Sequence, residues 1–140
     1  KFTNKLWNIG RYVEFARQSK GESQNANEKT LAESESAYSD DYSKKIHSLE
    51  KEITGYLDNY QFNYAAEKLY EFTWHSFADF YVEEIKKRIS VGASSNNLEN
   101  NFLIILKLLH PFMPFVTEEV YQRLGFGKSL MIEKWPQYEV

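Results

Sequence analysis

The feature that most constrains this 140-residue chain is an apolar stretch from Asn101 to Gly125 that two prolines interrupt. Between Phe102 and Leu109 only Lys107 is charged, so a helix here would be apolar on nearly every side. Such a helix is typical of the centre of a bundle, where other helices cover it all round. The sequence therefore predicts a buried helix in the middle of the fold.

The two prolines turn the chain directly after this helix. His110 disfavours the helical conformation because Pro111 follows it, and Pro111 has no amide hydrogen with which to continue the helix. Pro114 suits the first turn of a new helix, which Gly125 would end in a left-handed conformation. The predicted elbow consists of His110, Pro111, Phe112, Pro114 and Phe115. We expect the apolar side chains Phe112, Met113 and Phe115 to be buried beside it.

Composition indicates one folded domain. The length suits a single domain with a real core, and 16% of the residues are aromatic. There is no cysteine, so disulfides and thiolate metal sites are excluded, and no apolar run approaches the length of a membrane span. With a net charge of −3, any contact with nucleic acid has to be made by a local face. Because the chain opens on Lys1, already in helical pattern, we expect it to be a piece of a longer protein.

The first helix, expected from Phe2 to Gln18, has two unlike faces. At about 100° per residue, its core stripe is Phe2, Leu6, Ile9, Val13 and Ala16. The opposite face carries amides, a guanidinium and aromatic rings, namely Asn4, Trp7, Asn8, Arg11 and Phe15. Unpaired bases need such groups for hydrogen bonds to their edges and for stacking. The alternative is packing on another helix, which we favour for Trp7 and Phe15.

Two more long helices are predicted. Residues 19–39 hold one leucine among small polar residues and are expected to be a mobile linker. A second helix then begins at residues 40–41 and ends near Asn59, with a core face of Tyr42, Ile46, Leu49, Ile53 and Leu57. The third extends from Phe62 to about Ile89, and its expected core stripe is Phe62, Ala66, Leu69, Phe77 and Phe80.

The third helix ends in a charged run. In residues 83–88 two glutamates precede Lys86, Lys87 and Arg88, an order that suits pairing along the helix and the negative end of its dipole. On an acidic domain these cations are also the most plausible phosphate contact besides Arg11.

A metal interpretation arises from His75, Asp79 and Glu83, which follow one another at four-residue intervals. The first and third would lie about 12 Å apart along the helix axis, so one ion cannot bind all three. No partner constellation occurs elsewhere in the sequence, and we predict no metal site.

Several of these segments resemble a known family. Residues 108–119, Leu-Leu-His-Pro-Phe-Met-Pro-Phe-Val-Thr-Glu-Glu, resemble the elbow in the anticodon-binding helical domain of class I aminoacyl-tRNA synthetases for valine, leucine and isoleucine. Residues 5–13 resemble the opening of that domain, although Gly10 stands where the family usually has alanine. The Tyr-x-Phe-x-Trp and Phe-x-Asp-aromatic-Tyr-x-Glu patterns of residues 70–83, and residues 129–136, resemble valyl-tRNA synthetases in particular.

With the patterns above, this resemblance implies an all-α bundle of about five helices with a short strand-like C-terminal extension, acting as an anticodon-binding domain. The parent enzyme would be cytoplasmic and would join valine to tRNA with ATP and Mg²⁺. The His-x-Gly-His and Lys-Met-Ser-Lys-Ser signatures of that catalytic domain are absent here, so we expect no catalytic residue and no cofactor in this chain. Expected partners are the anticodon stem-loop and the catalytic domain of the same chain, without DNA or membrane.

The residues expected to contact tRNA are Asn4, Asn8, Arg11, Glu83, Lys86 and Lys87. Two alternatives stay open. One is the same domain of an isoleucyl- or leucyl-tRNA synthetase, and the other is a helical module that binds proteins.

Overall fold

The structure, a computed structural model, describes residues 1–19, 28–90 and 97–137. Its elements are α1 (Phe2–Ser19), α2 (Glu28–Asp58), α3 (Phe62–Glu71), η1 (Phe72–Val82), α4 (Glu83–Ser90), α5 (Leu98–Leu109), α6 (Pro114–Arg123) and η2 (Leu130–Ile132). Because α3, η1 and α4 follow one another without a break, they form one long rod. The described ranges thus form five helical rods, and the prediction of an all-α bundle is confirmed.

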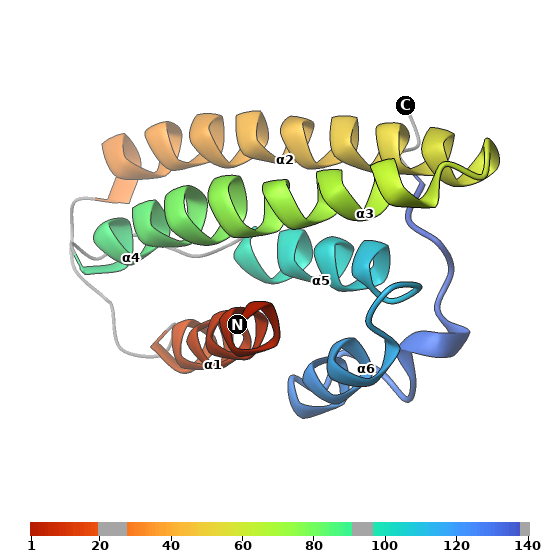
Figure 1. Ribbon diagram of the computed structural model, residues 1–140. Coiled ribbons are helices and arrows are strands. Elements are labelled where there is room, and N and C mark those ends of the chain that lie inside the picture. The colour runs from red at the N-terminus through yellow and green to blue at the C-terminus, as the bar shows by residue number, and fades with distance from the viewer. Residues whose placement is uncertain (20–27, 91–96, 138–140) are drawn as a thin grey trace.

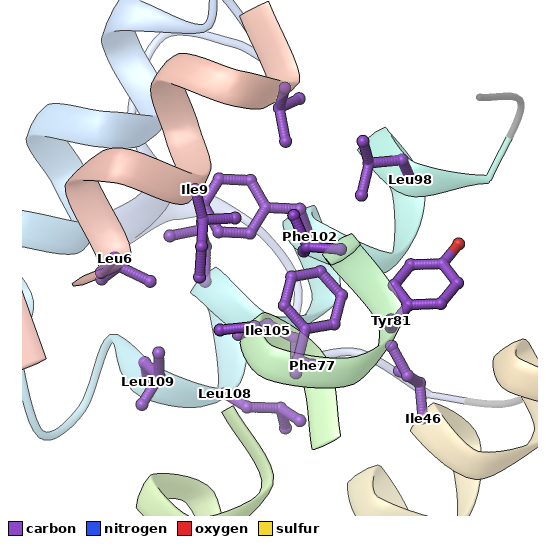
Figure 2. Close-up of a cluster of buried hydrophobic side chains, with 14 of the residues drawn as sticks. Leu6, Ile9, Ile46, Phe77, Tyr81, Leu98, Phe102, Ile105, Leu108 and Leu109 are labelled. Carbon is purple, nitrogen blue, oxygen red and sulfur yellow. The ribbon is translucent and has the colours of Figure 1, made fainter. Parts of the chain in front are cut away.

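The rods surround α5, as the sequence predicts. In Figure 1, α2 lies along the α3–η1–α4 rod, α5 lies below that pair, and α1 and α6 lie on the far side of α5. Figure 2 shows Phe102 and Ile105 of α5 among side chains from η1, α1 and α2, including Phe77, Ile9 and Ile46. In the part of the chain that the structure describes, no helix is long and apolar enough to cross a membrane.

The core faces predicted for α1 and α2 are confirmed. In α1 the stripe from Leu6 to Ala16 is buried, and in α2 the stripe from Tyr42 to Ile53 is buried. Phe2 and Leu57, at the outer ends of these two stripes, are half-buried.

The predicted start of α2 is wrong. The helix begins at Glu28 instead of Asp40 or Asp41, so residues 28–39 of the predicted linker are helical. Three glutamates and two alanines lie in that segment, and both residue types have high helix propensity, which does not depend on an apolar stripe. Residues 20–27 of the predicted linker lie outside the described residues.

The middle of the long rod, η1, is a π-helix, and this changes which side chains face the core. A π-helix closes hydrogen bonds between residues five apart, so each turn holds more residues than an α-helical turn. Residues four apart therefore stay on one face of the rod. The face that packs into the core consists of Thr73, Phe77, Tyr81 and Ile85, all of which are buried. The predicted stripe assumed an α-helical period, and Phe80 is 56% exposed instead. Phe62 is also exposed, because it lies at the start of α3 with its ring against the exposed ring of Tyr60.

The elbow follows the predicted path. Pro111 comes directly after α5 and its cap residue His110, and Pro114 is the first residue of α6. The His110 Nδ1 atom lies 2.9 Å from the hydroxyl oxygen of the fully buried Thr117, which ties the elbow to α6. Gly125 has a φ of +67°, the left-handed stop that the sequence predicts.

The prediction that Phe115 is buried is wrong. Its side chain is 91% exposed, and Phe112 and Met113 are only half-buried. Helix α6 buries Thr117 and Val120. Phe115 precedes Thr117 by two positions, and about 200° of helical rotation places it on the opposite side of α6.

The C-terminal extension is not strand-like. It contains the single 3₁₀ turn η2, and no strand occurs within the described ranges. The Glu118 carboxylate accepts a hydrogen bond of 2.9 Å from the first amide of η2, and the Trp135 indole donates one of 2.9 Å to Thr54 in α2. The extension therefore links α6 to α2 along one end of the bundle (Figure 1).

Arg17 joins three helices. Its Nε and Nη2 atoms donate to the Glu99 carboxylate of α5 at 3.1 and 3.3 Å, and its Nη1 atom donates to the Leu124 carbonyl after α6 at 2.6 Å. The side chains of Arg17 and Glu99 are both partly exposed, which limits the strength of their ion pair. We therefore expect Arg17→Ala to lower the free energy of unfolding by roughly 1–2 kcal/mol. Lys45→Ala, which removes an exposed pair within α2, is the control for urea denaturation. Equal losses in the two variants would contradict the bridging role of Arg17.

Two buried tyrosines stack between α2 and η1. The rings of Tyr42 and Tyr81 are 3.9 Å apart at an interplanar angle of 9°. Asn101 donates to the Tyr81 hydroxyl at 3.1 Å, and the Tyr42 hydroxyl lies 3.0 Å from that of Ser76. Burial raises the pKa of Tyr81 to about 12 and also raises the pKa of Tyr42.

The folded bundle should therefore keep both tyrosine protons at pH values where the unfolded chain has lost them. Since the folded-state pKa is the higher one, the free energy of unfolding is expected to fall as pH rises from about 10 towards 12. Urea denaturation across that range measures the fall, and Tyr81→Phe should make it less steep. A stability that stays level across this interval would contradict the burial of the two hydroxyls.

Candidate nucleic-acid interface

The outward face of α1 gathers the groups that the sequence predicts for RNA contact. Asn4, Asn8 and Arg11 are all exposed and lie opposite the buried Leu6 and Val13. Residues three and four apart lie above one another on a helix, so these side chains form a continuous row. The row supplies amide and guanidinium donors without breaking the core stripe.

The two aromatic residues near this row differ in their surroundings. Trp7 is half-buried and packs on the core, and the Arg123 guanidinium of α6 lies 4.7 Å from the centre of its ring. Its predicted packing role is confirmed. For Phe15 the same prediction is wrong, because it lies two positions, about 200°, from buried Val13 and is 58% exposed. We define the outward face of α1 as Asn4, Asn8, Arg11 and Phe15.

Arg11 differs from the other arginines. Arg17, Arg88 and Arg123 have glutamate oxygens at 3.1, 3.5 and 2.9 Å. The exposed Arg11 has no hydrogen bond or ion pair with any residue that the structure describes. Its guanidinium therefore keeps all its donors for a phosphate or a base edge.

Lys86 connects the end of α4 to α1. Its ammonium lies 2.8 Å from the Glu83 carboxylate and 5.1 Å from the centre of the Tyr12 ring. Burial, and then the negative charge of Glu83, raise the pKa of Tyr12, whose ring is 6.1 Å from that of Phe15. Glu83 and Lys86 thus lie beside the outward face of α1, and their contact with RNA stays a prediction.

The basic run at residues 86–88 does not form one cluster. Lys87 is exposed and lies two positions from buried Ile85, so it points away from the core, and it makes no described contact with α1. Arg88 turns to α2, where its guanidinium lies 4.2 Å from the centre of the Tyr38 ring. Lys86, Lys87 and Arg88 therefore point in three different directions and do not form one phosphate-binding cluster.

A second aromatic group, which the sequence did not predict as a surface, lies between α1 and the adjoining helices α3 and η1. The rings of Phe2, Tyr70 and Trp74 lie 5.1 to 6.2 Å from one another, and the Lys5 ammonium lies 4.9 Å from the Trp74 ring. Tyr70 is 45% exposed, so this group reaches the surface of the bundle. The one-turn spacing of Tyr70 and Trp74 is visible in the sequence, but their position beside α1 depends on tertiary packing.

The row of His75, Asp79 and Glu83 contains ion pairs. His75 Nδ1 lies 3.7 Å from the Asp79 carboxylate, which also accepts a hydrogen bond from Lys5. This bond from Lys5 lowers the pKa of Asp79. No group of three histidine, aspartate or glutamate side chains in the described ranges is arranged to hold a metal ion.

Comparison with known proteins agrees with this geometry. Residues 41–140 match the family described as the anticodon-binding domain of tRNA ligase. Proteins named valine–tRNA ligase are similar over nearly the whole chain: that of Thermotoga maritima is 37% identical over 99% of this chain, that of Pseudothermotoga lettingae 34% over 100%, and that of Coxiella burnetii 36% over 99%. The chain spans about 16% of the length of these relatives. The family match covers most of the chain, and the chain therefore belongs to the family of anticodon-binding domains of tRNA ligases.

Proposed function

We propose that this chain is the anticodon-binding domain of a valine–tRNA ligase and that it holds the anticodon loop on the outward face of α1. The relatives named above carry the valine name, which supports valine over leucine and isoleucine. The observation that carries the proposal is the exposed Arg11, which pairs with no residue that the structure describes and lies beside Asn8 and about one turn from Phe15. An unpaired base needs a donor for its edge and a ring for its face, and this row offers both.

In this proposal the domain contributes position, while the chemistry belongs to the parent enzyme. By binding the anticodon nucleotides, the domain would orient the tRNA so that its acceptor end reaches a catalytic domain in the same polypeptide. ATP and Mg²⁺ would bind in that catalytic domain. The bundle suits this positioning role, because the elbow and the contacts of Arg17 keep α1, α5 and α6 in one arrangement.

Titration with anticodon stem-loops tests the proposal. We expect the valine stem-loop to bind more tightly than isoleucine or leucine stem-loops, and an unrelated RNA duplex to bind least. Because the chain is acidic, few phosphates should be neutralised, with a slope of about −0.7 in log affinity against log salt for each. Equal affinity for all these RNAs, or none for any of them, would favour the alternative of a helical module that binds proteins.

A further inference from the structure

We propose that Phe115, Met131 and Ile132 form a docking surface for another domain of the parent polypeptide, an inference that rests on the proposed function. The three side chains are 91%, 73% and 75% exposed. Large apolar side chains that are exposed together mark interaction sites more often than scattered ones do. We call these three residues the elbow surface.

The Glu118 carboxylate shows that the three residues are neighbours. Glu118 lies one helical turn after Phe115, on the same side of α6. Its Oε2 atom accepts a hydrogen bond of 2.9 Å from the amide of Leu130, the first residue of η2. Leu130 itself is buried, and Met131 and Ile132 directly after it are exposed. The outer side of α6 and the 3₁₀ turn therefore make one apolar surface around the Glu118 carboxylate.

The chemistry of the elbow surface favours a protein over RNA. Burial raises the pKa of Glu118, but hydrogen bonds from Ser129, Gln122 and the amides of η2 lower it by more. The net shift of the pKa is downward, so the carboxylate stays charged. The negative charge at the centre of the surface, between Phe115 and η2, repels phosphates, and the exposed cations Lys128 and Lys134 lie before and after η2 instead of within the surface. A partner with apolar side chains and a hydrogen-bond donor for the rim suits this surface.

The size of the surface favours a partner on the same polypeptide. Three side chains are too few for a stable dimer, which typically buries about 1,200–2,000 Å². Domains within one chain dock through smaller areas, because the linker keeps their effective concentration high. The relatives are far longer than this chain, which covers 16% of them, so the proposed parent enzyme has further domains to supply the partner.

The elbow surface can be occupied while RNA is bound. Phe115 lies at the start of α6, and Arg123, which covers Trp7 of α1, lies at its end, about 12 Å along the axis. Figure 1 shows α1 on one side of α6 and η2 on the other side. The partner domain and the anticodon loop would therefore contact different sides of the bundle.

Hydroxyl-radical footprinting of the purified parent enzyme tests this inference on the complete polypeptide. Phe80 and Met113 are matched references, since Phe80 is 56% exposed and Met113 is half-buried. If the surface is free, Phe115 should be oxidised faster than Phe80, and Met131 faster than Met113. If a domain covers the surface, as we propose, Phe115 should be oxidised more slowly than Phe80. Met131 should then be oxidised several-fold more slowly than its exposure predicts. Phe115→Ser should restore the oxidation of Met131, whereas Phe80→Ser should not.

Three outcomes would overturn the inference. Oxidation rates that follow the exposures given above would mean that nothing covers the surface. Protection that appears only when tRNA is added would assign it to RNA, and protection lost on dilution would assign it to a second copy. Charging of tRNA by the same preparation is measured separately, so a failure of the proposed function is distinguishable from a failure of the docking surface.

Discussion

Replacing Phe102 by alanine should lower the free energy of unfolding by about 3–5 kcal/mol, the largest effect of any single substitution considered for this chain. Phe102 is fully buried in α5, and its ring lies 6.0 Å from that of Phe77 in η1. The backbone of α1 also comes close, because a methyl group at Gly10 would lie 3.8 Å from the Phe102 ring. Truncation would leave a cavity where three rods meet, and these rods cannot all close around it.

Phe115→Ala is the matched control, since it makes the same chemical change where the ring is 91% exposed. It should alter stability by no more than about 0.5 kcal/mol. Urea denaturation of both variants measures the difference. Similar losses in the two variants would mean that the core is not centred on α5.

Much of the fold can be predicted from the spacing of apolar residues. The stripes of α1 and α2, the burial of α5 and the turn at Pro111 all follow from rules that involve a few neighbouring residues. Such rules fail where the helical period itself changes. In η1 the π-helical turn keeps Tyr81 on the buried face and leaves Phe80 in solvent, and no local pattern in the sequence indicates that turn.

The contacts that depend on tertiary structure were also beyond local rules. Arg17 looks like an ordinary surface arginine in the sequence, yet it reaches Glu99 and the Leu124 carbonyl, more than 80 residues away. A methyl group at Gly10 would lie 3.0 Å from a side-chain carbon of Val120 in α6. Glycine at this position therefore suits the close approach of α1 and α6, a reason visible only once the helices are placed.

For the candidate site, the outward face of α1 could be predicted and its accessibility could not. Asn4, Asn8 and Arg11 lie where helical geometry predicts. Whether another helix covers them depends on the packing of the whole bundle, and for Phe15 the expectation of cover was wrong. Likewise, the charged run at residues 83–88 predicts one basic cluster, but its three cations point in different directions.

Arg11→Ala should weaken binding of the valine anticodon stem-loop by roughly 1–3 kcal/mol if the guanidinium reads a base edge. Arg11 has no described protein partner, so the substitution removes no contact within the bundle and should leave its stability unchanged. If Arg11 contacts only phosphate, the loss of affinity should be the same for cognate and non-cognate loops. The slope of log affinity against log salt should then become shallower by the amount that one phosphate contact contributes.

Arg88→Ala provides the control for Arg11→Ala, because it removes an equal charge from the α2 side, where Arg88 covers Tyr38. It should leave stem-loop binding almost unchanged. Fluorescence titration at several salt concentrations compares the two variants. Equal weakening by both would show that overall charge, and not the outward face of α1, controls binding.

The most direct measurement of the central claim is a heteronuclear NMR titration of the labelled chain, which at 16.6 kDa is small enough for residue-by-residue mapping. On addition of the valine anticodon stem-loop, the account predicts the largest shifts in the side-chain amides of Asn4 and Asn8, the Arg11 guanidinium and the Phe15 ring. The solvent-facing side of α2 between Asp41 and Glu52 should remain unchanged. Shifts concentrated on that part of α2, with the outward face of α1 undisturbed, would contradict the account.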